Sequence, residues 1–290
     1  MSNIVKSSLH FFNDLVQGRE AGNSAIRAFE ADNNFISTSF IRELIQNAID
    51  AWNKSSGRPV KLAFRLVDIE DQHQTFLSDL YKEVMPLLTM GINTKKSKPF
   101  IYSDKNLYKK ALVIEEFNTI GLTGRYDRKR NNEAEWHFSN YMYGVNRDTK
   151  IEGGGSAGVG KITSNMVSEL RSVMFITSRS DDHQVWAGGR VEFDKAHTIG
   201  NDTFDNCSFL SNSQLTKDLA LLSDLDKDKL CSPIKANQDI DLLKKIFKLK
   251  RADSDNGTSW IIPAPLHETK DCKKKIGLWF MMQPELVSPN

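Results

Sequence analysis

The sequence is poor in cysteine and in long apolar runs, and each shortage excludes a class of protein. The 290 residues contain three cysteines, Cys207, Cys231 and Cys272, which lie far apart. They form no CxxC pair and no cluster with histidine, which excludes a disulfide framework and a zinc site of the usual spacing. No run of about 18 apolar residues is present, so no membrane-spanning helix is predicted. The N-terminus lacks the features of a signal peptide, and we expect a cytoplasmic protein.

Charge of one sign is also not in excess. The chain has 39 Lys and Arg against 37 Asp and Glu, a formal net charge of +2. This balance does not by itself indicate a nucleic-acid binder. A basic run at 125–130 leaves nucleic acid open as a ligand, and a solvated loop is the alternative. The length and the hydrophobic share of 39% are those of a globular chain with one large domain or two small ones.

Apolar periodicity predicts an alternation of helices and strands. A helical lead-in is expected in the first 35 residues, where Leu9, Phe12 and Leu15 have helical spacing. Helices are then predicted at 37–53, 76–88 and 162–170, and strands at 60–66, 111–115, 173–177, 184–193 and 258–262. The polar segment 202–255 is expected to be an insertion. Residues 266–290 are too short for a domain and are interpreted as a tail or as the start of a second domain.

The first motif with chemical content is the helix Glu43–Ala51. Glu43, Asn47 and Asp50 stand at i, i+4 and i+7, so that a helix brings all three side chains to one face. A carboxylate and an amide oxygen one turn apart suit a divalent cation and an activated water. A solvated polar face of an amphipathic helix is the alternative.

The second motif is the glycine loop Gly153–Lys161, which leads into an apolar helix. Successive glycines let backbone N–H groups turn toward one anion, and the N-terminus of the following helix adds its positive end. The motif therefore predicts phosphate binding. A P-loop is disfavoured because Ile162 stands where that motif needs a hydroxyl for magnesium.

Two weaker motifs lie on predicted strands. The strand 111–115 leads to Glu115 and Glu116, and Gly121 follows in a turn. A buried carboxylate there can accept a hydrogen bond from an adenine amino group. Thr258 follows Gly257 at the start of the last strand. Each of these two motifs, taken alone, indicates only a strand and a turn.

Taken in order, the four motifs resemble the N, G1, G2 and G3 boxes of the GHKL ATPase superfamily, which includes gyrase B, MutL, the MORC ATPases, the ninety-kilodalton heat-shock chaperones and histidine kinases. The resemblance covers about residues 40–262. It departs at the G1 box, where the family has Asp-x-Gly-x-Gly and this chain has Glu116 with one extra residue before Gly121, so that Glu115 or Glu116 would contact adenine. The implied fold is an α+β Bergerat two-layer sandwich over residues 1–265, with a mostly antiparallel sheet covered by helices on one face.

The resemblance also implies ATP and Mg²⁺ as cofactors and a role for each matching residue. Glu43 and Lys161 would be catalytic, Glu43 as the general base that orients water. Asn47 would hold magnesium and Asp50 would support the site. The remaining implied contacts are with adenine, through Glu116, Gly121 and Thr258, and with the phosphates, through Gly155, Gly158, Gly160 and Lys161. Residues 124–161 would form a lid over the nucleotide.

The function implied is magnesium-dependent ATP hydrolysis that drives lid closure and a conformational change or dimerisation. The expected partners are a second copy or a protein that supplies a transducer element. Alternatives are an ATP-sensing module without turnover and a histidine-kinase-type phosphotransferase, for which only His10 lies upstream as an acceptor. Likeness to stand-alone MORC-like members implies a place in prokaryotic DNA handling or anti-phage defence.

Overall fold

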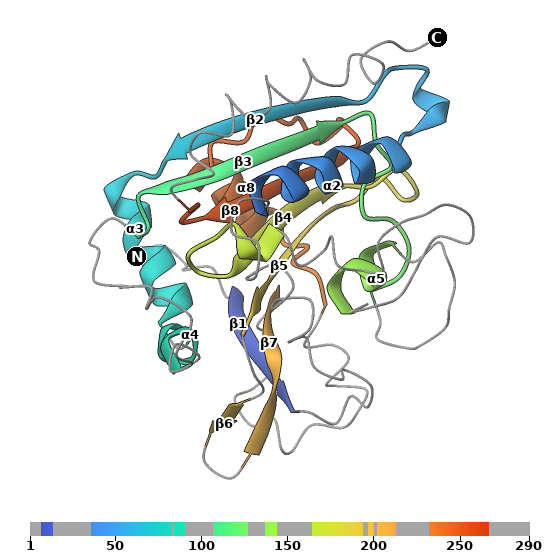
Figure 1. Cartoon of the computed structure of the whole chain (residues 1–290). Coiled ribbons are helices and arrows are strands. Elements are labelled where there is room, and N and C mark those ends of the chain that lie inside the picture. The colour runs from blue at the N-terminus through green and yellow to red at the C-terminus, as the bar shows by residue number, and fades with distance from the viewer. Residues whose placement is uncertain are drawn as a thin grey trace.

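The computed structural model describes residues 7–13, 36–82, 84–90, 107–126, 137–143, 164–193, 197–199, 202–212 and 232–266. Within them the protein is an α+β structure built on an eight-stranded sheet (Figure 1). The strands are β1 (Ser7–Asn13), β2 (Lys61–Asp68), β3 (Lys110–Phe117), β4 (Ser172–Ser178), β5 (Val185–Glu192), β6 (His197–Ile199), β7 (Asp202–Asn212) and β8 (Gly257–Pro263). The helices are α2 (Ile36–Asp50), the 3-10 helix η1 (Lys54–Ser56), α3 (Asp71–Tyr81), α4 (Met85–Met90), α5 (His137–Tyr143) and α8 (Asn237–Ile246).

The strand order brings together segments that are far apart in the sequence. It runs β1-β7-β5-β4-β8-β3-β2, with β6 paired to β7, and every pairing among these strands is antiparallel. The last strand, β8, lies between β3 and β4. The strand that leads to Glu115 and Glu116 and the strand that begins with Gly257 and Thr258 are therefore neighbours in the sheet.

Helices cover both faces of the sheet, which corrects the expected sandwich with helices on one face. Helices α2 and α5 pack with Leu112 and Ile114 of β3 on one side. Helices α3, α4 and α8 pack with Ala111 and Val113 of the same strand on the other side. We call these sides the α2 face and the α8 face. The physical reason is that β3 and β4 are buried along both faces, so that each face needs a covering layer.

Helix α2 is an amphipathic helix, as its sequence predicts. Its buried side chains are Phe40, Ile41, Leu44, Ile45 and Ala48, which recur at helical spacing and pack against the sheet. Much of the remaining helix surface is exposed, and Ile49, beside the buried stripe, has 44% relative accessibility. Figure 1 shows α2 lying across the sheet, on the opposite side of β3 from α8.

The single helix expected at 76–88 is divided into α3 and α4, and the helix expected at 162–170 is reduced to one turn at 164–166 in the described residues. Two further differences concern the sheet. Residues 7–13 form strand β1, not a helix, because they pair with β7, which is distant in the sequence. Short apolar segments of this kind are ambiguous in period, and tertiary pairing decides their structure. The expected insertion 202–255 contributes β7 to the sheet and α8 to the core, so its described parts are integral to the fold.

Within the described residues, no helix combines the length and the apolar character needed to cross a membrane. Cys207 is a buried thiol in the core of the α2 face. Cys231 and Cys272 lie outside the described residues.

Candidate functional site

Helix α2 carries the three predicted polar side chains outside its buried stripe. Glu43 is half-buried, and Asn47 and Asp50 are exposed. Gln46 donates a hydrogen bond from Nε2 to Oδ1 of Asp50 over 2.9 Å. At 100° per residue, Asn47 borders the buried side of the helix, Glu43 lies farther round, and Asp50 lies nearly opposite the buried side.

The C-terminal end of α2 is tied to the loop that follows β3. The N–H of Ile120 donates to the carbonyl of Ala51 over 2.8 Å. The N–H of Asn53 donates to the carbonyl of Asn118 over 2.9 Å. These two bonds hold the C-terminal end of α2 next to the end of β3, where the two candidate glutamates lie.

Glu115 and Glu116 point to opposite faces of the sheet, because successive side chains alternate along a strand. Glu115 lies on the α8 face with Ala111 and Val113, and Glu116 lies on the α2 face. The carboxylate of Glu115 is already used in contacts within the protein. Its carboxylate pairs with Arg65 and accepts the N–H groups of Lys250 and Arg251 over 3.0 and 2.9 Å. Of the two glutamates, only Glu116 shares a face with the polar stripe of α2.

Glu116 is a buried carboxyl whose proton affinity is changed by its surroundings. Its relative accessibility is 5%, and the indole N–H of Trp260 donates to its Oε1 over 2.5 Å. Burial raises the pKa of Glu116 to about 7, while the Trp260 hydrogen bond and the charge of Arg251 partly oppose the increase. The group therefore titrates near neutral pH, where a hydrogen-bond donor on a ligand would favour the ionised form.

Aromatic side chains surround Glu116 on the α2 face. The rings of Trp260 and Tyr141 have centroids 4.8 Å apart, and those of Trp260 and Phe175 are 5.9 Å apart. Burial raises the pKa of Tyr141 to about 12, and its hydroxyl has no hydrogen-bond partner within the described residues. Sequence reasoning missed these residues. The signal for Trp260 was its position two residues after Thr258, which places both side chains on one face.

Thr258 belongs to a buried polar junction between β8, β4 and the loop after β3. Its hydroxyl lies 3.1 Å from that of Thr177, which accepts the N–H of Leu122 over 2.8 Å. Gly121 lies against the same junction with φ of +73°. A Cβ on Gly121 would lie 2.7 Å from the carbonyl oxygen of Ser178 and 2.8 Å from the Thr177 hydroxyl. The glycine is therefore required for the loop to approach β4.

A second cluster fixes the next residues of this loop. Arg179 donates to the carbonyl of Leu122 over 2.9 Å, and the N–H of Gly124 donates to Asp181 over 2.9 Å. The Arg179 guanidinium also stacks on the ring of Trp186, 3.5 Å from its centroid. The loop from Gly121 to Gly124 is thus held at several points.

Part of the predicted lid packs as core. Helix α5 lies inside the range 124–161, and its Phe138 and Met142 are buried on the α2 face. The glycine loop lies outside the described residues, and so do its predicted phosphate contacts Gly155, Gly158, Gly160 and Lys161.

The structure therefore brings together part of the predicted site. Glu116 and Thr258 face the side that α2 covers, and the C-terminal end of the helix that carries Glu43 and Asn47 is held to the loop after Glu116. Within the described residues, no group of three or more His, Cys, Asp and Glu side chains is arranged to hold a metal ion. The chain matches no model of a protein family, and no curated protein matches it significantly.

The requirement for glycine at position 121 can be tested against a second glycine of the same backbone conformation. Gly121→Ala should lower the free energy of unfolding by about 2–4 kcal/mol, because a Cβ there meets the backbone of β4. Gly57 has φ of +62° and open space around its Cβ position, so Gly57→Ala should cost only about 1 kcal/mol. Urea unfolding of the two variants measures the difference, and equal losses would contradict the close approach.

Glu116→Gln should remove a pH dependence of stability. The folded pKa of about 7 lies above the ordinary 4.5, so the folded state holds this proton longer than the unfolded chain. The stabilisation is complete below pH 4.5 and is lost as the pH rises to about 7. Relative to the variant, the wild type should lose on the order of 3 kcal/mol across this window. Urea unfolding of both proteins from pH 4.5 to 8 measures it, and a constant difference would show that Glu116 is not desolvated.

Proposed function

We propose that this chain binds ATP with Mg²⁺ and hydrolyses it, in a site of the Bergerat type. One observation carries the proposal. Glu116 and Thr258 face the side of the sheet that α2 covers, and backbone hydrogen bonds hold the end of α2 to the loop after Glu116. This arrangement supports a site in which a carboxylate for adenine and side chains for a metal-bound phosphate, from distant parts of the sequence, act on one side of the sheet.

Glu116 is the proposed acceptor for the amino group of adenine. Its buried carboxylate takes one hydrogen bond from Trp260, which fixes its orientation. A charge-assisted bond from the base amino group contributes about 1.5–3 kcal/mol. Tyr141 and Trp260 supply apolar surface next to the carboxylate. The hydroxyls of Thr258 and Thr177 lie within hydrogen-bond distance of each other on the same face of the sheet.

Glu43 and Asn47 are the proposed groups at the phosphate end. Glu43 would accept a proton from the water that attacks the terminal phosphate, and half-burial is compatible with that role. The exposed amide oxygen of Asn47 is a hard ligand of the kind that Mg²⁺ prefers. Bound magnesium would supply charge neutralisation at the phosphates. A single protein ligand suits Mg²⁺, because it keeps several waters and binds through substrate phosphates.

Asp50 would support the stripe through its hydrogen bond with Gln46. The glycine loop and Lys161 would wrap the phosphates, and ATP-dependent ordering of the lid would drive a conformational change or association with a second copy or a partner. We further propose a cytoplasmic protein of prokaryotic DNA handling or anti-phage defence. That wider role rests on the likeness of the sequence motifs to MORC-like ATPases.

Glu43→Gln should lower the rate of ATP hydrolysis by about 10²–10⁴-fold and leave ATP affinity nearly unchanged, because the amide keeps the shape of the side chain but cannot take a proton. Arg42→Gln is a matched control, since Arg42 is exposed on the same helix. Steady-state phosphate release measures turnover. A variant that hydrolyses ATP at the wild-type rate would remove Glu43 from the mechanism, and a wild type without turnover would indicate an ATP-sensing module.

Asn47→Ala should weaken ATP binding in the presence of magnesium by about tenfold, equivalent to about 1.4 kcal/mol, because the cation loses its protein oxygen. Affinity measured with EDTA should be the same for variant and wild type. Calorimetric titration under both conditions tests this. An equal loss of affinity with and without magnesium would assign Asn47 a structural role instead.

A further inference from the structure

Strand β2 forms an open edge of the sheet. It is the last strand in the order, and in the described part of the chain no strand pairs with its outer side. The N–H of Ile69 donates to the carbonyl of Lys109 over 2.8 Å, which continues the register of β2 and β3. Backbone groups alternate in direction along a strand, so the odd residues of β2 bond to β3. The even residues Leu62, Phe64 and Leu66 turn their N–H and C=O groups outward.

The register of the neighbouring strands gives the same assignment independently. The N–H of Ala264 donates to the carbonyl of Lys110 over 3.0 Å, so the even residues of β3 bond to β8. The odd residues of β3 are left to bond to β2. The outward groups of β2 therefore form a row that an added extended backbone can pair with.

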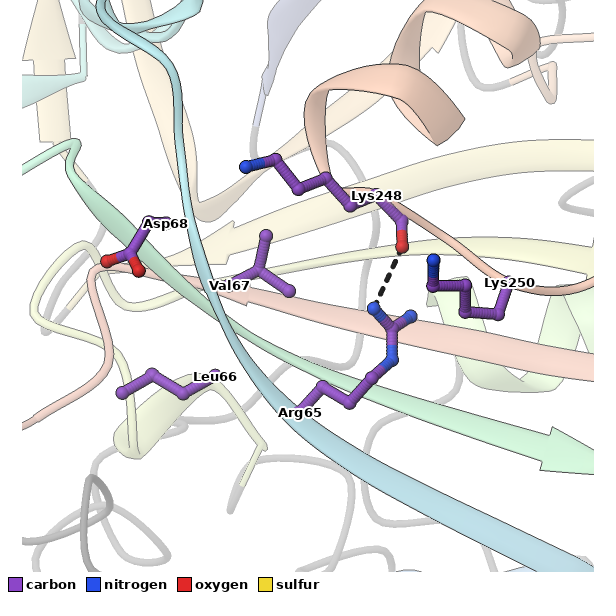
Figure 2. Close-up of a pocket in the computed structure, with 6 residues that line it drawn as sticks. All are labelled: Arg65, Leu66, Val67, Asp68, Lys248 and Lys250. Atoms are coloured by element: carbon purple, nitrogen blue, oxygen red, sulfur yellow. Dashed lines mark hydrogen bonds between the residues drawn. The ribbon is translucent and has the colours of Figure 1, made fainter.

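A basic cavity lies along this edge, lined by Arg65 and Val67 from the α8 face and by Leu66 and Asp68 from the α2 face. Its volume is about 340 Å³, and it is lined by Arg65, Leu66, Val67, Asp68, Lys248 and Lys250. Figure 2 shows Lys248 and Lys250 flanking the guanidinium of Arg65, which donates to the carbonyl of Lys248 over 2.8 Å. The carboxylate of Asp68 already pairs with Lys110 over 3.0 Å. The lining therefore has two lysines, an arginine that pairs with Glu115, and a carboxylate that pairs with Lys110.

The backbone at Lys248 is held in an unusual conformation beside this cavity. Helix α8 ends in a Schellman motif, in which Leu249 N–H donates to Lys244 O and Lys248 N–H donates to Lys245 O, over 2.9 and 3.2 Å. Glycine is the usual residue at the left-handed position of this motif. Lys248 occupies it with φ of +50°, at a conformational cost that glycine would avoid. The position aims the Lys248 carbonyl at Arg65.

An apolar stripe lies on the α2 face of the same edge. Leu62 and Phe64 are half-buried against the core of that face. Leu66 follows at the same alternation and is 37% exposed, one of the few large hydrophobic side chains exposed in the described chain. The edge thus presents cations on one face and apolar side chains on the other.

We propose that the edge of β2 binds an extended peptide segment of a partner protein, in which acidic and apolar residues alternate. The peptide adds a strand to the sheet through the outward backbone groups of Leu62, Phe64 and Leu66. Its acidic side chains face the basic cavity and its apolar side chains cover the apolar stripe. A free phosphate would satisfy the cations but would leave the backbone row and the stripe unmatched.

A labelled eight-residue peptide of alternating glutamate and valine is the probe. Fluorescence anisotropy should give a Kd on the order of 10 μM. Two control peptides, one with lysine in place of glutamate and one with four glutamates followed by four valines, should bind at least about tenfold more weakly. Amide exchange followed by NMR should slow at Leu62, Phe64 and Leu66 on binding. Equal binding of the three peptides, or protection elsewhere alone, would overturn the proposal.

Two variants separate the contributions of the lysine charges and of the outward backbone groups to peptide binding. Lys248→Glu with Lys250→Glu should weaken binding at least about tenfold, because the cavity changes sign. Leu66→Pro should also weaken it, because it removes an outward N–H and no hydrogen bond to β3. The exposed pair Lys54→Glu with Lys82→Glu is the matched charge control and should bind as the wild type does.

Circular dichroism establishes that each variant folds. If Leu66→Pro is unfolded, the Lys248 and Lys250 double variant alone decides the outcome. Unchanged affinity in the folded variants would overturn the proposal. Sedimentation of the protein without peptide tests whether a second copy of the chain occupies the edge of β2 instead. A dimer that protects the same three amides and that Leu66→Pro dissociates would show that a second copy occupies the edge, and would also overturn it.

Discussion

At the end of β3, two successive carboxylates turn to opposite faces of the sheet, and the arrangement of the site depends on that alternation. Glu115 is used as a structural anchor, since it accepts two backbone N–H groups and pairs with Arg65. The anchor fixes the segment after α8 against β3. Glu116, one residue later, is left on the α2 face, where among the described residues Trp260 donates a hydrogen bond to its carboxylate. A shift of β3 by one residue would exchange the two environments.

The surrounding contacts keep that register. Arg251 follows the anchored backbone and donates to the carbonyl of Glu116, to Ser259 and to Asp255, so that β3 and β8 are tied at the same point. Burial lowers the pKa of Arg251 to about 10, and the nearby carboxylates partly restore it. On the α2 face, the end of α2 and the Gly121 loop are fixed to the same strand end. The proposed base contact is therefore rigid before any ligand arrives, which favours selective binding.

The sequence predicted the elements whose signal is local. The helix expected at 37–53 is found at Ile36–Asp50, and the strands expected at 111–115, 173–177 and 258–262 are found within two residues at each end. Their apolar periodicity is strong and needs no information from elsewhere in the chain. The predictions that were wrong concern structure that depends on tertiary pairing. Residues 7–13 become a strand only beside β7, and the second helical layer follows from the burial of β3 on both faces. The contact between Trp260 and Glu116 joins residues 144 apart in sequence.

The central claim is that the Glu116 carboxylate reads the amino group of an adenine base. Calorimetric titration of the wild-type protein with ATP and with ITP in the presence of magnesium tests it most directly, because inosine has a carbonyl oxygen where adenine has the amino group. Loss of a charge-assisted hydrogen bond of about 1.5–3 kcal/mol predicts that ATP binds about 10- to 100-fold more tightly than ITP. Equal affinities for the two nucleotides, or no binding of ATP, would contradict the account.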